Sequence, residues 1–450
     1  MRLFEWLVLL SFVPLLATPL LPARWRGEWL PVTVALPVLA CAVHVVAEGW
    51  RSQMAPLYLL ALVVLAVRLP ALAGRRVAAP RWLALLVSAA MAVLVVLGGL
   101  LAGWLLPVIS LPEPTGPHHV GIVEREVDAG SGRRLMTSVW YPAATDGPPA
   151  PLTRHPDEIA AALGNLTGLP APVFQHLRYV TLAASDGVPA LAEGGPLPVL
   201  VFSHGLVGVR LQNSPTLQDL ASWGYVVVAI DHTDAAAVTV FPDGETRFYD
   251  PERFGIPAGE NPDAVMVEEH MFPVWVADQR AVYDELDVWN EDDPVLAGRL
   301  DLTRVGSFGH SFGGATALDV CLSDPRCGAA LDLDGGLYGE SVATPAVRPL
   351  MLMTSADSGA NAAANEKWRG LAENAGDAFY WLELPNSSHL SFTFTELLSP
   401  VLVPQGFDPR AGLATVDAHV RAFFDAHLRG EDAPLLDPAS PSPGVRWIAR

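Results

Sequence analysis

The sequence predicts a mostly parallel α/β domain preceded by an all-α membrane anchor of about four helices. The chain has 450 residues, of which 51% are hydrophobic and only 17% charged, which is too apolar for an ordinary soluble protein or a disordered one. Long apolar segments end near residue 110, and short apolar runs then alternate with amphipathic stretches, as is typical of α/β domains. We therefore expect an anchor, a Pro-rich linker, an α/β domain and a C-terminal tail over residues 1–110, 111–118, 119–430 and 431–450.

Four apolar segments form the predicted anchor: residues 3–21, 30–47, 54–72 and 82–109. About 20 apolar residues cross a bilayer as a helix, and the fourth segment contains no charged residue at all. A cleaved signal peptide is the simpler interpretation of the first segment. However, three more hydrophobic segments follow it, and no small-residue cleavage site stands before them. We expect four membrane-spanning helices in a multi-pass protein of the cell membrane.

The arginines near the span ends predict the orientation, because basic residues there are retained in the cytoplasm. The first and third loops contain five arginines, whereas the other side has two. The five are Arg24, Arg26, Arg75, Arg76 and Arg81, and the two are Arg2 and Arg51. The large C-terminal domain is therefore predicted to face outside the cytoplasm.

The composition excludes several classes of function. With 28 basic and 48 acidic residues, the formal net charge is −20. Such a surface repels phosphate backbones, so we expect no nucleic-acid partner. The three cysteines, Cys41, Cys321 and Cys327, are too few and too scattered for a disulfide framework or a four-cysteine zinc site. No metal cluster is visible in the sequence.

Cys321 and Cys327 stand on either side of a short turn in the α/β domain. Two buried thiols are the simpler interpretation of this pair. A disulfide that closes the turn is the alternative, since an extracytoplasmic domain folds in an oxidising compartment.

The pattern after residue 118 predicts eight strands and four helical stretches. The strands are expected over residues 120–127, 135–141, 198–203, 225–231, 304–308, 329–334, 349–355 and 378–384. The helices are expected over residues 216–223, 274–289 and 412–428 and after Ser311. The tail from Glu431 contains four prolines and is expected to be disordered or loosely draped.

A Gly-x-Ser-x-Gly motif lies at residues 309–313, between an apolar strand and a helix-forming stretch. This arrangement predicts a nucleophile elbow, in which a sharp, strained turn exposes the Oγ of Ser311. The glycines remove Cβ atoms that would collide with the neighbouring strand and helix. The helix N-terminus behind the serine favours developing negative charge. Ser311 is the predicted nucleophile.

A serine hydroxyl needs a histidine base and an orienting acid, which follow the serine in the order acid and then histidine in this fold. Three histidines follow Ser311. His419 and His427 lie on an amphipathic helix and are interpreted as surface residues. His389 instead lies in a loop after a strand, and it is therefore the predicted base.

Three aspartates are candidates for the acid. Asp334 lies at the carboxyl end of a strand just before two glycines, where an α/β sheet presents its site. Asp332 is one pleat deeper on the same face, and Asp357 follows the next strand. Asp334 is the preferred candidate, with the other two left open.

Acyl transfer also needs backbone N–H donors for an oxyanion. We expect one from Phe312, directly after the nucleophile, and one from Leu206, in the loop after an earlier strand. Gly205 would allow the backbone to approach the substrate. His204 precedes the nucleophile in sequence and is interpreted as structural.

These segments together resemble the platelet-activating factor acetylhydrolase family of α/β hydrolases, in its plasma, intracellular type II and bacterial forms. The matching pieces are residues 140–143, 202–206, 309–316, 333–335 and 388–393. The resemblance implies Ser311 as nucleophile, His389 as base, and the amides of Leu206 and Phe312 as the oxyanion hole. For the acid, the vertebrate pattern selects Asp332 and the bacterial Leu-Asp-Gly pattern selects Asp334. The four-span anchor departs from the family pattern.

The resemblance implies a serine esterase that hydrolyses a short acyl ester without a cofactor, in phospholipids the sn-2 acetyl group or another short acyl group. A general carboxylesterase or a cutinase-like polyester hydrolase is the alternative. A third possibility, of another class, is a membrane-anchored sensor whose hydrolase fold only binds a ligand. Four apolar residues are expected to line the approach to the serine: Leu166, Leu169, Val173 and Phe174.

Overall fold

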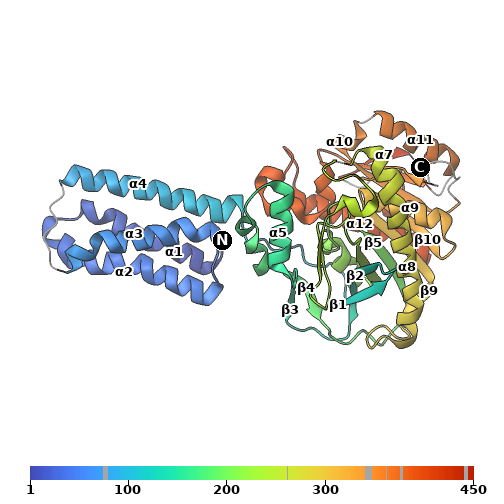
Figure 1. Cartoon of the computed structure of the whole chain (residues 1–450), viewed down its shortest axis with the longest axis horizontal. Coiled ribbons are helices and arrows are strands. Elements are labelled where there is room, and N and C mark those ends of the chain that lie inside the picture. The colour runs from blue at the N-terminus through green and yellow to red at the C-terminus, as the bar shows by residue number, and fades with distance from the viewer. Residues whose placement is uncertain are drawn as a thin grey trace.

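The computed structural model describes residues 1–73, 80–260, 262–339, 347–360, 362–375, 379–439 and 444–449. It has two parts that lie end to end along the long axis of the molecule, a helical bundle and an α/β domain (Figure 1). The N-terminus lies at the end of the bundle that touches the α/β domain (Figure 1).

The bundle consists of four long apolar helices. They are α1 (Leu3–Ala17), α2 (Ala23–Glu48), α3 (Ala55–Leu72) and α4 (Arg81–Leu100). Short turns extend three of them: η1 (Thr18–Leu20), η2 (Ser52–Met54) and the π-helical turn η3 (Leu101–Leu105). All four are long and apolar enough to cross a membrane, as the sequence predicts. Their outward-facing side chains are mainly leucine and valine, which suits a hydrocarbon environment.

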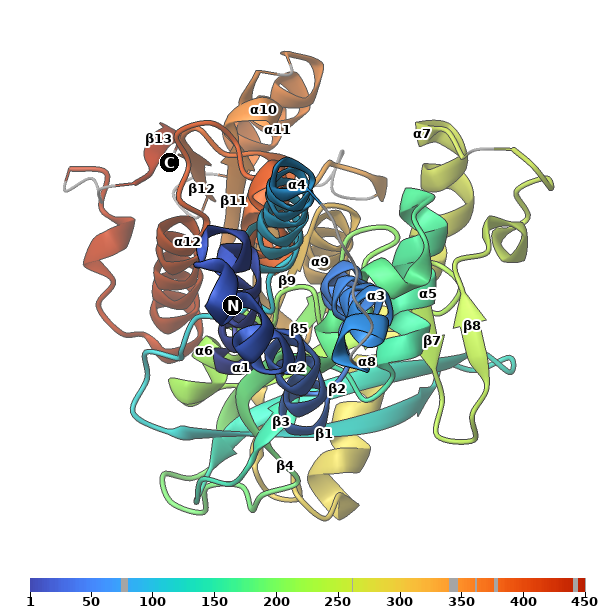
Figure 2. The same ribbon diagram turned by 90° about the vertical axis from the view of Figure 1, so that its left-hand side faces the viewer.

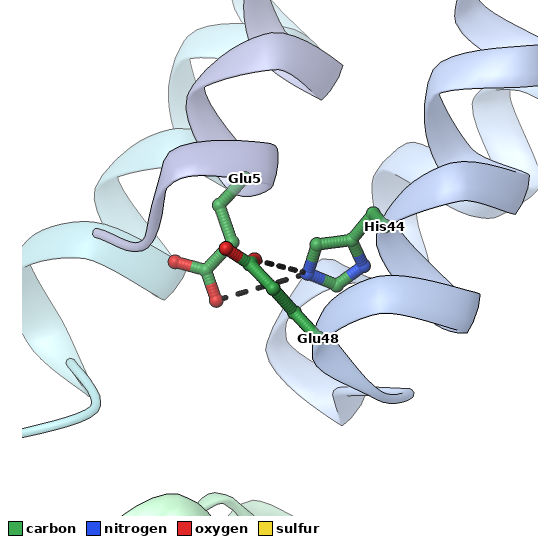
Figure 3. Close-up of side chains that lie close together, drawn as sticks. All are labelled: Glu5, His44 and Glu48. Atoms are coloured by element: carbon green, nitrogen blue, oxygen red, sulfur yellow. Dashed lines mark ion pairs between the residues drawn. The ribbon is translucent and has the colours of Figure 1, made fainter.

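An ionic network ties the bundle together at the end next to the α/β domain. His44 Nε2 lies 3.9 Å from an oxygen of Glu5 and 3.5 Å from an oxygen of Glu48 (Figure 3). Arg51 donates to Glu5 Oε1 at 2.7 Å and to the Ala102 carbonyl at 2.8 Å. Buried charges are stable only when they are paired, so this network fixes how α1, α2 and α4 meet.

The α/β domain is built on an eleven-stranded sheet in the order β13-β12-β11-β10-β9-β5-β6-β2-β1-β4-β3. Six neighbouring strands of this sheet, in the order β12-β11-β10-β9-β5-β6, are parallel to one another. Their bounds are β5 (Leu197–Ser203), β6 (Val226–Asp231), β9 (Leu300–His310), β10 (Cys327–Leu333), β11 (Leu350–Ser355) and β12 (Phe379–Leu384). The other strands of this sheet are β1 (His119–Asp128), β2 (Arg134–Ala143), β3 (Pro149–Pro151), β4 (Thr181–Asp186) and β13 (Arg446–Ala449). A separate hairpin pairs β7 (Val238–Val240) with β8 (Thr246–Phe248).

Helices cover both faces of the sheet because its strands are apolar on both sides. On β5, Val199 and Val201 belong to one core, and Leu200 and Phe202 belong to the other. The first core includes α8 (Phe272–Asp292), α9 (Phe312–Ser323) and α11 (Ala362–Ala375). The second includes α6 (Ser214–Ser222) and α12 (Pro409–Phe424). The remaining helices are α5 (Pro156–Thr167), α7 (Ala264–Met266) and α10 (Ala356–Gly359). The eight predicted strands and four predicted helical stretches are all present.

The prediction of a disordered or loosely draped tail is wrong for its last described residues. Strand β13 pairs antiparallel with β12, so that Trp447 lies opposite Leu382. The short turn η14 (Pro434–Leu436) also buries Leu436. Apolar residues of the tail, among them Leu436 and Trp447, allow this burial and strand pairing. The prediction relied on the prolines and did not take these apolar residues into account. Pro441 and Pro443 lie outside the described residues.

The interpretation of His419 as a surface residue is also wrong, while His427 is half-buried. His419 is buried and its Nδ1 lies 2.7 Å from the Thr415 carbonyl oxygen, while His427 Nε2 lies 3.1 Å from the Tyr380 hydroxyl. The helix α12 contacts not only α6 but also η14 and the loop after β12. These extra elements cover the face that the periodicity of α12 predicts to be exposed.

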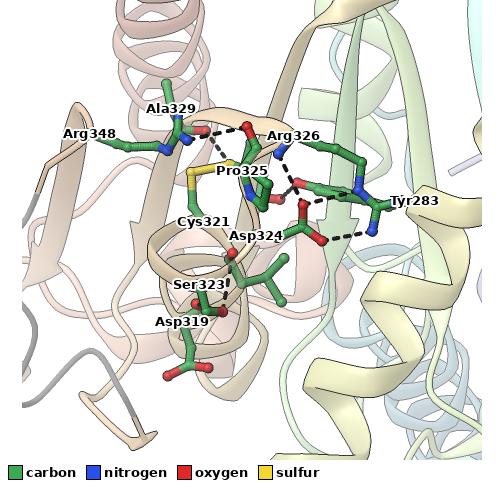
Figure 4. The surroundings of a disulfide bond; sticks show 12 residues. Tyr283, Asp319, Cys321, Ser323, Asp324, Pro325, Arg326, Ala329 and Arg348 are labelled. Atoms are coloured by element: carbon green, nitrogen blue, oxygen red, sulfur yellow. Dashed lines mark hydrogen bonds and ion pairs between the residues drawn. A yellow bond between two sulfur atoms is a disulfide. The ribbon is translucent and has the colours of Figure 1, made fainter.

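Cys321 and Cys327 form a disulfide, so the simpler interpretation as two thiols is wrong (Figure 4). The amide of Asp324 donates to the Val320 carbonyl at 2.7 Å, which turns the chain sharply between α9 and β10. This turn brings the two Cα atoms within 4.9 Å of each other. The bond therefore joins the helix that follows Ser311 to the strand that precedes the candidate acids.

We expect the double substitution Cys321→Ser/Cys327→Ser to lower the free energy of unfolding by about 2 kcal/mol, because the unfolded chain loses the closed loop. Denaturant unfolding followed by circular dichroism measures the loss. As a control, thiol titration of the unfolded, unreduced wild type should find Cys41 alone reactive. Three reactive thiols would contradict the disulfide.

Candidate active site

Ser311 stands on a strained turn between β9 and α9. Its backbone has φ 57° and ψ −122°, a conformation that only a tightly constrained site maintains. A Cβ at position 309 would lie 2.3 Å from the carbonyl carbon of Gly313, so the turn closes only with glycine there. The Ser311 amide also donates to the Leu333 carbonyl of β10 at 2.9 Å. The structure thus has the elbow geometry that the motif predicts.

His389 and Asp334 meet at the carboxyl edge of the sheet. His389 Nδ1 lies 2.7 Å from Asp334 Oδ2. Asp334 has a left-handed backbone, with φ 60°, and its carboxylate accepts three further bonds: from the Ser355 amide at 2.6 Å, the Ser355 hydroxyl at 2.9 Å and the Ser358 hydroxyl at 3.0 Å. Burial by itself would raise the pKa of Asp334. The bond and charge of His389 and the bonds from Ser355 outweigh burial, and the pKa lies below its usual value.

Asp332 and Asp357 lie differently from Asp334. Asp332 is fully buried, its Oδ1 accepts from the Gly335 amide at 2.7 Å, and its Oδ2 has no partner among the described residues. Burial raises the pKa of Asp332 well above its usual value, and the charge of Asp334 adds to the effect. Asp357 is exposed on α10. Of the three candidate acids, Asp334 is the one that forms a hydrogen bond with His389 in the part of the chain that the structure describes.

The loop that contains Leu206 passes directly beside the serine. A Cβ at Gly205 would lie 3.2 Å from the Ser311 Cβ, so glycine allows this close approach. Leu206 and Ser311 line the same cavity, and Phe312 is the first residue of α9. The two peptide N–H groups that the sequence predicts as oxyanion donors therefore lie on the two backbone segments next to Ser311.

His204 is structural, as predicted, and it acts on the same loop. Its Nδ1 donates to the Gly205 carbonyl at 2.6 Å, and its Nε2 accepts from the His232 amide at 3.3 Å. Burial holds the pKa of His204 well below its usual value, so the ring is neutral and one nitrogen accepts. The Gly205 carbonyl and the Leu206 N–H belong to one peptide group, so His204 sets the direction of that N–H.

A second serine, histidine and aspartate cluster lies beneath this loop, and the sequence analysis did not find it. His232 Nε2 lies 3.1 Å from Ser203 Oγ, and its Nδ1 lies 3.0 Å from Asp278 Oδ2. Asp278 also forms an ion pair with Arg133 at 2.6 Å. Ser203, His232 and Asp278 are all buried, so this cluster supports the loop at residues 203–206 and has no route to a substrate.

His310, the residue before the serine, is a further functional residue that the sequence analysis missed. Its Nε2 donates to the His389 carbonyl at 2.9 Å, and its Nδ1 accepts from Gln212 at 2.9 Å. Burial, together with the nearby charge of His389, lowers the pKa of His310 to about 3, so the ring stays neutral. It therefore ties the loop of His389 to the elbow. The position of His310 inside the Gly-x-Ser-x-Gly motif, directly before the serine, could have indicated its role.

Ser311 and His389 open into an apolar cavity of about 280 Å³. Its apolar lining includes Leu152, Ile159, Ala162, Leu163, Leu177, Leu206, Leu211, Phe394 and Leu398. The predicted approach residues Leu166, Leu169, Val173 and Phe174 are not among those that line it, which corrects the prediction. The helix α5 turns Ile159, Ala162 and Leu163 toward the serine, so Leu166 lies one turn too far along it.

Glu5, His44 and Glu48 are the described residues that come close to a metal-binding arrangement, with ligand atoms within 4.8 Å of one another. They lie in the bundle and not at the serine (Figure 3). Arg51 and Arg2 pair with Glu5, at 2.7 and 3.1 Å, and Arg2 lies 3.6 Å from Glu48. The arginines neutralise these carboxylates, so the group is an ionic network and carries no metal role here.

The comparisons with known proteins agree with this geometry. The family model "Platelet-activating factor acetylhydrolase, isoform II" matches residues 106–254. The platelet-activating factor acetylhydrolase of Cavia porcellus is 28% identical over 55% of this chain and 60% of its own length. The protein of Arthroderma benhamiae named "Probable 1-alkyl-2-acetylglycerophosphocholine esterase" is 28% identical over 52% of this chain and 61% of its length. The chain thus spans about 60% of the length of these curated relatives.

A longer match and a solved structure extend the comparison. The platelet-activating factor acetylhydrolase of Gallus gallus is 25% identical over 71% of this chain and 83% of its own length. The ferulic acid esterase of Streptomyces cinnamoneus superposes with a TM-score of 0.62 at 27% identity, covering 76% of this chain and all of that one.

The sheet order, the elbow after β9 and the esterase neighbour define an α/β hydrolase. Within that class, the family model covers the linker and the loop that contains Leu206, both within residues 106–254. The chain is similar to the platelet-activating factor acetylhydrolase family.

Asp334→Asn should leave the fold intact and lower kcat by up to about 10⁴-fold, because His389 loses the carboxylate that orients it. Asp332→Asn, the matched control on the same strand, should change the stability and leave kcat close to the wild-type value. Steady-state kinetics with a soluble ester and thermal unfolding separate the two effects. A kinetic loss that follows Asp332 would make the vertebrate-type alignment the correct one.

Proposed function

We propose that the protein is a serine carboxylic-ester hydrolase that acts on short-acyl esters through an acyl-enzyme. The observation that carries the proposal is that Asp334 holds His389 at the mouth of the cavity into which Ser311 opens. A protein that only binds a ligand needs no strained serine, no oriented histidine and no ionised buried aspartate together. The ligand-binding sensor is therefore disfavoured.

In the proposed mechanism, His389 takes the proton from Ser311 Oγ as Oγ attacks the carbonyl carbon of the ester. The N–H groups of Leu206 and Phe312 stabilise the oxyanion that forms. His389 then protonates the departing alcohol, which leaves the acyl group on Ser311. Water, activated by the same histidine, releases the acid. Asp334 stays ionised throughout and stabilises the imidazolium.

The names of the relatives support a short acyl group as the substrate moiety. An apolar space of about 280 Å³ beside the serine has room for an acyl group. The relatives named for platelet-activating factor and for 1-alkyl-2-acetylglycerophosphocholine point to the sn-2 acetyl ester of a phospholipid. The ferulic acid esterase neighbour favours the second candidate, a general carboxylesterase.

We also propose that residues 1–110 are a four-span membrane anchor and that the catalytic domain, residues 119–430, lies outside the cytoplasm. The Cys321–Cys327 disulfide supports an oxidising compartment. The two arginines that count against this orientation, Arg2 and Arg51, are both paired with Glu5. The five arginines of the first and third loops, Arg24, Arg26, Arg75, Arg76 and Arg81, outnumber these two, which favours this orientation.

Ser311→Ala should lower kcat by several powers of ten while the domain remains folded. The assay is a panel of p-nitrophenyl esters from acetyl to palmitoyl, run beside 1-alkyl-2-acetylglycerophosphocholine. If the sn-2 acetyl ester of a phospholipid is the substrate, the acetylated phospholipid and the shortest esters should be preferred. Retention of more than about a tenth of the wild-type kcat would exclude Ser311 as nucleophile.

The orientation predicts that a reporter fused after residue 115 lies outside the cytoplasm. An alkaline phosphatase fusion should be active and a fluorescent-protein fusion dark, because the phosphatase needs an oxidising compartment to form its disulfides. A fusion after Arg26, in the first turn of α2 and on the opposite side of the membrane, is the control and should give the reverse result. Bright fluorescence with an inactive phosphatase at residue 115 would invert the orientation.

A further inference from the structure

We propose that the cavity takes its substrate directly from the membrane leaflet into which the bundle is inserted. Two segments that wall the cavity lie against this leaflet on either side of the bundle. We call them wall 1, residues 156–179, and wall 2, residues 389–402. The partner surface is a zwitterionic lipid leaflet. This inference rests on the proposed ester hydrolysis and adds where the substrate comes from.

Wall 1 joins the cavity to the bundle. It contributes Ile159, Ala162, Leu163 and Leu177 to the cavity lining. Its far side is bonded to the chain between α2 and α3: Gln53 Nε2 donates to the Val173 carbonyl at 2.7 Å, and the Ser52 hydroxyl donates to the Pro172 carbonyl. The Arg2 guanidinium lies 4.5 Å from the centre of the Tyr179 ring. One short segment therefore touches both the cavity and the ends of three helices.

Wall 2 joins the cavity to the bundle on the side opposite wall 1. It contains His389 and contributes Leu390, Phe394 and Leu398 to the cavity lining. Its last turn, η12 (Pro400–Leu402), contacts η3, the turn that ends α4. Viewed from the bundle end, α5 of wall 1 lies beside α3, and the orange segment with wall 2 lies behind α4 (Figure 2). The strand and helix of the elbow, β9 and α9, lie behind the bundle between the two walls (Figure 2).

The contacts place both walls at the depth where the helices leave the hydrocarbon. The candidate spans end at Glu48 and Leu105 and begin again at Ser52. Wall 1 is bonded to Ser52 itself, and wall 2 packs on η3, whose last residue is Leu105. Because these contacts leave no room for a water layer or a linker, the surfaces beside them lie in the interfacial region of the bilayer.

The exposed residues of the two walls suit that environment. Leu166 and Leu169 of wall 1 are 43% and 49% exposed, and Val401 of wall 2 is 68% exposed. Trp104, on η3 next to wall 2, is 58% exposed, and tryptophan is enriched at the membrane interface. Single exposed apolar residues are ordinary, but these flank one cavity and adjoin the ends of candidate spans.

The charge of the chain decides which kind of lipid surface fits. A protein with a formal net charge of −20 is repelled by anionic lipids, so its contact with the leaflet depends on apolar side chains and on the anchor. Phosphatidylcholine is therefore the appropriate test surface. An ester lipid that diffuses within the leaflet then reaches the cavity between the walls without crossing bulk water.

The test compares one enzyme on two substrates. The full chain is reconstituted into phosphatidylcholine vesicles that contain a few mole per cent of a long-chain 1-alkyl-2-acetyl phosphatidylcholine, and it is also assayed with water-soluble p-nitrophenyl acetate. The variant is Leu166→Glu/Val401→Glu, which places one charge on each wall. The control is Val288→Glu, at a side chain that is 54% exposed. Val288 belongs to α8, a helix on the side of the domain away from the bundle (Figure 1).

We expect the double variant to hydrolyse the vesicle lipid at least about tenfold more slowly, since charged side chains are costly in the interface. Its kcat/KM for p-nitrophenyl acetate should stay within about twofold of wild type. The Val288→Glu control should leave both rates unchanged. A rate on vesicles that equals wild type overturns the inference, and so does an equal loss on both substrates.

A second measurement does not depend on the glutamate variants folding. Val401→Cys and Val288→Cys are labelled with a polarity-sensitive fluorophore in the same vesicles. The label at position 401 should be blue-shifted and protected from iodide, and the label at 288 should be quenched; equal quenching at both overturns the inference. A wild type that hydrolyses neither substrate would instead overturn the proposed function. Activity on p-nitrophenyl acetate with a quenched label at 401 overturns only the supply from the leaflet.

Discussion

The site depends on shifting the pKa values of two neighbouring buried carboxylates in opposite directions, down for Asp334 and up for Asp332. Asp332 and Asp334 lie two residues apart at the end of one strand, and burial raises the pKa of each. Asp334 overcomes this cost with hydrogen bonds from His389, Ser355 and Ser358, whereas Asp332 has one bond, from a backbone amide. The hydrogen bonds therefore favour the charged form of Asp334, and the left-handed backbone at Asp334 directs its carboxylate toward those donors.

The parts of the site that follow a local rule could be predicted from the sequence. The strand, turn and helix around Ser311, the order of acid and histidine, and the glycine beside the serine are all set by short-range sterics, which one sequence displays. The contacts of His310, His204 and His232 could not be predicted, because each depends on a partner on another element. The same reason explains the errors at α5, at His419 and in the tail, where burial is set by segments distant in the sequence.

The arginines that pair with the buried carboxylate of Glu5 also connect the helical bundle to the α/β domain. Glu5 lies inside an apolar helix, and a charge there is tolerated only because Arg51 and Arg2 reach it from either side. Arg51 extends further to the carbonyl of Ala102, and Arg2 extends to the ring of Tyr179 in the α/β domain. One set of charges therefore holds the helices to each other and to a wall of the cavity, which makes the bundle part of the same mechanical unit as the site.

Both edge strands of the large sheet offer few free backbone groups for pairing with another chain. One is β13, a four-residue strand that covers β12, and the other is β3, whose Pro149 and Pro151 have no N–H to donate. Proteins tethered in a membrane share one height and one orientation, so neighbouring copies present the same border to each other at every collision. Unpaired edge strands in that setting would form backbone hydrogen bonds with the edge strands of a neighbouring copy. If the bundle anchors the chain in a membrane as proposed, the short and proline-containing borders disfavour edge-to-edge pairing between neighbouring copies.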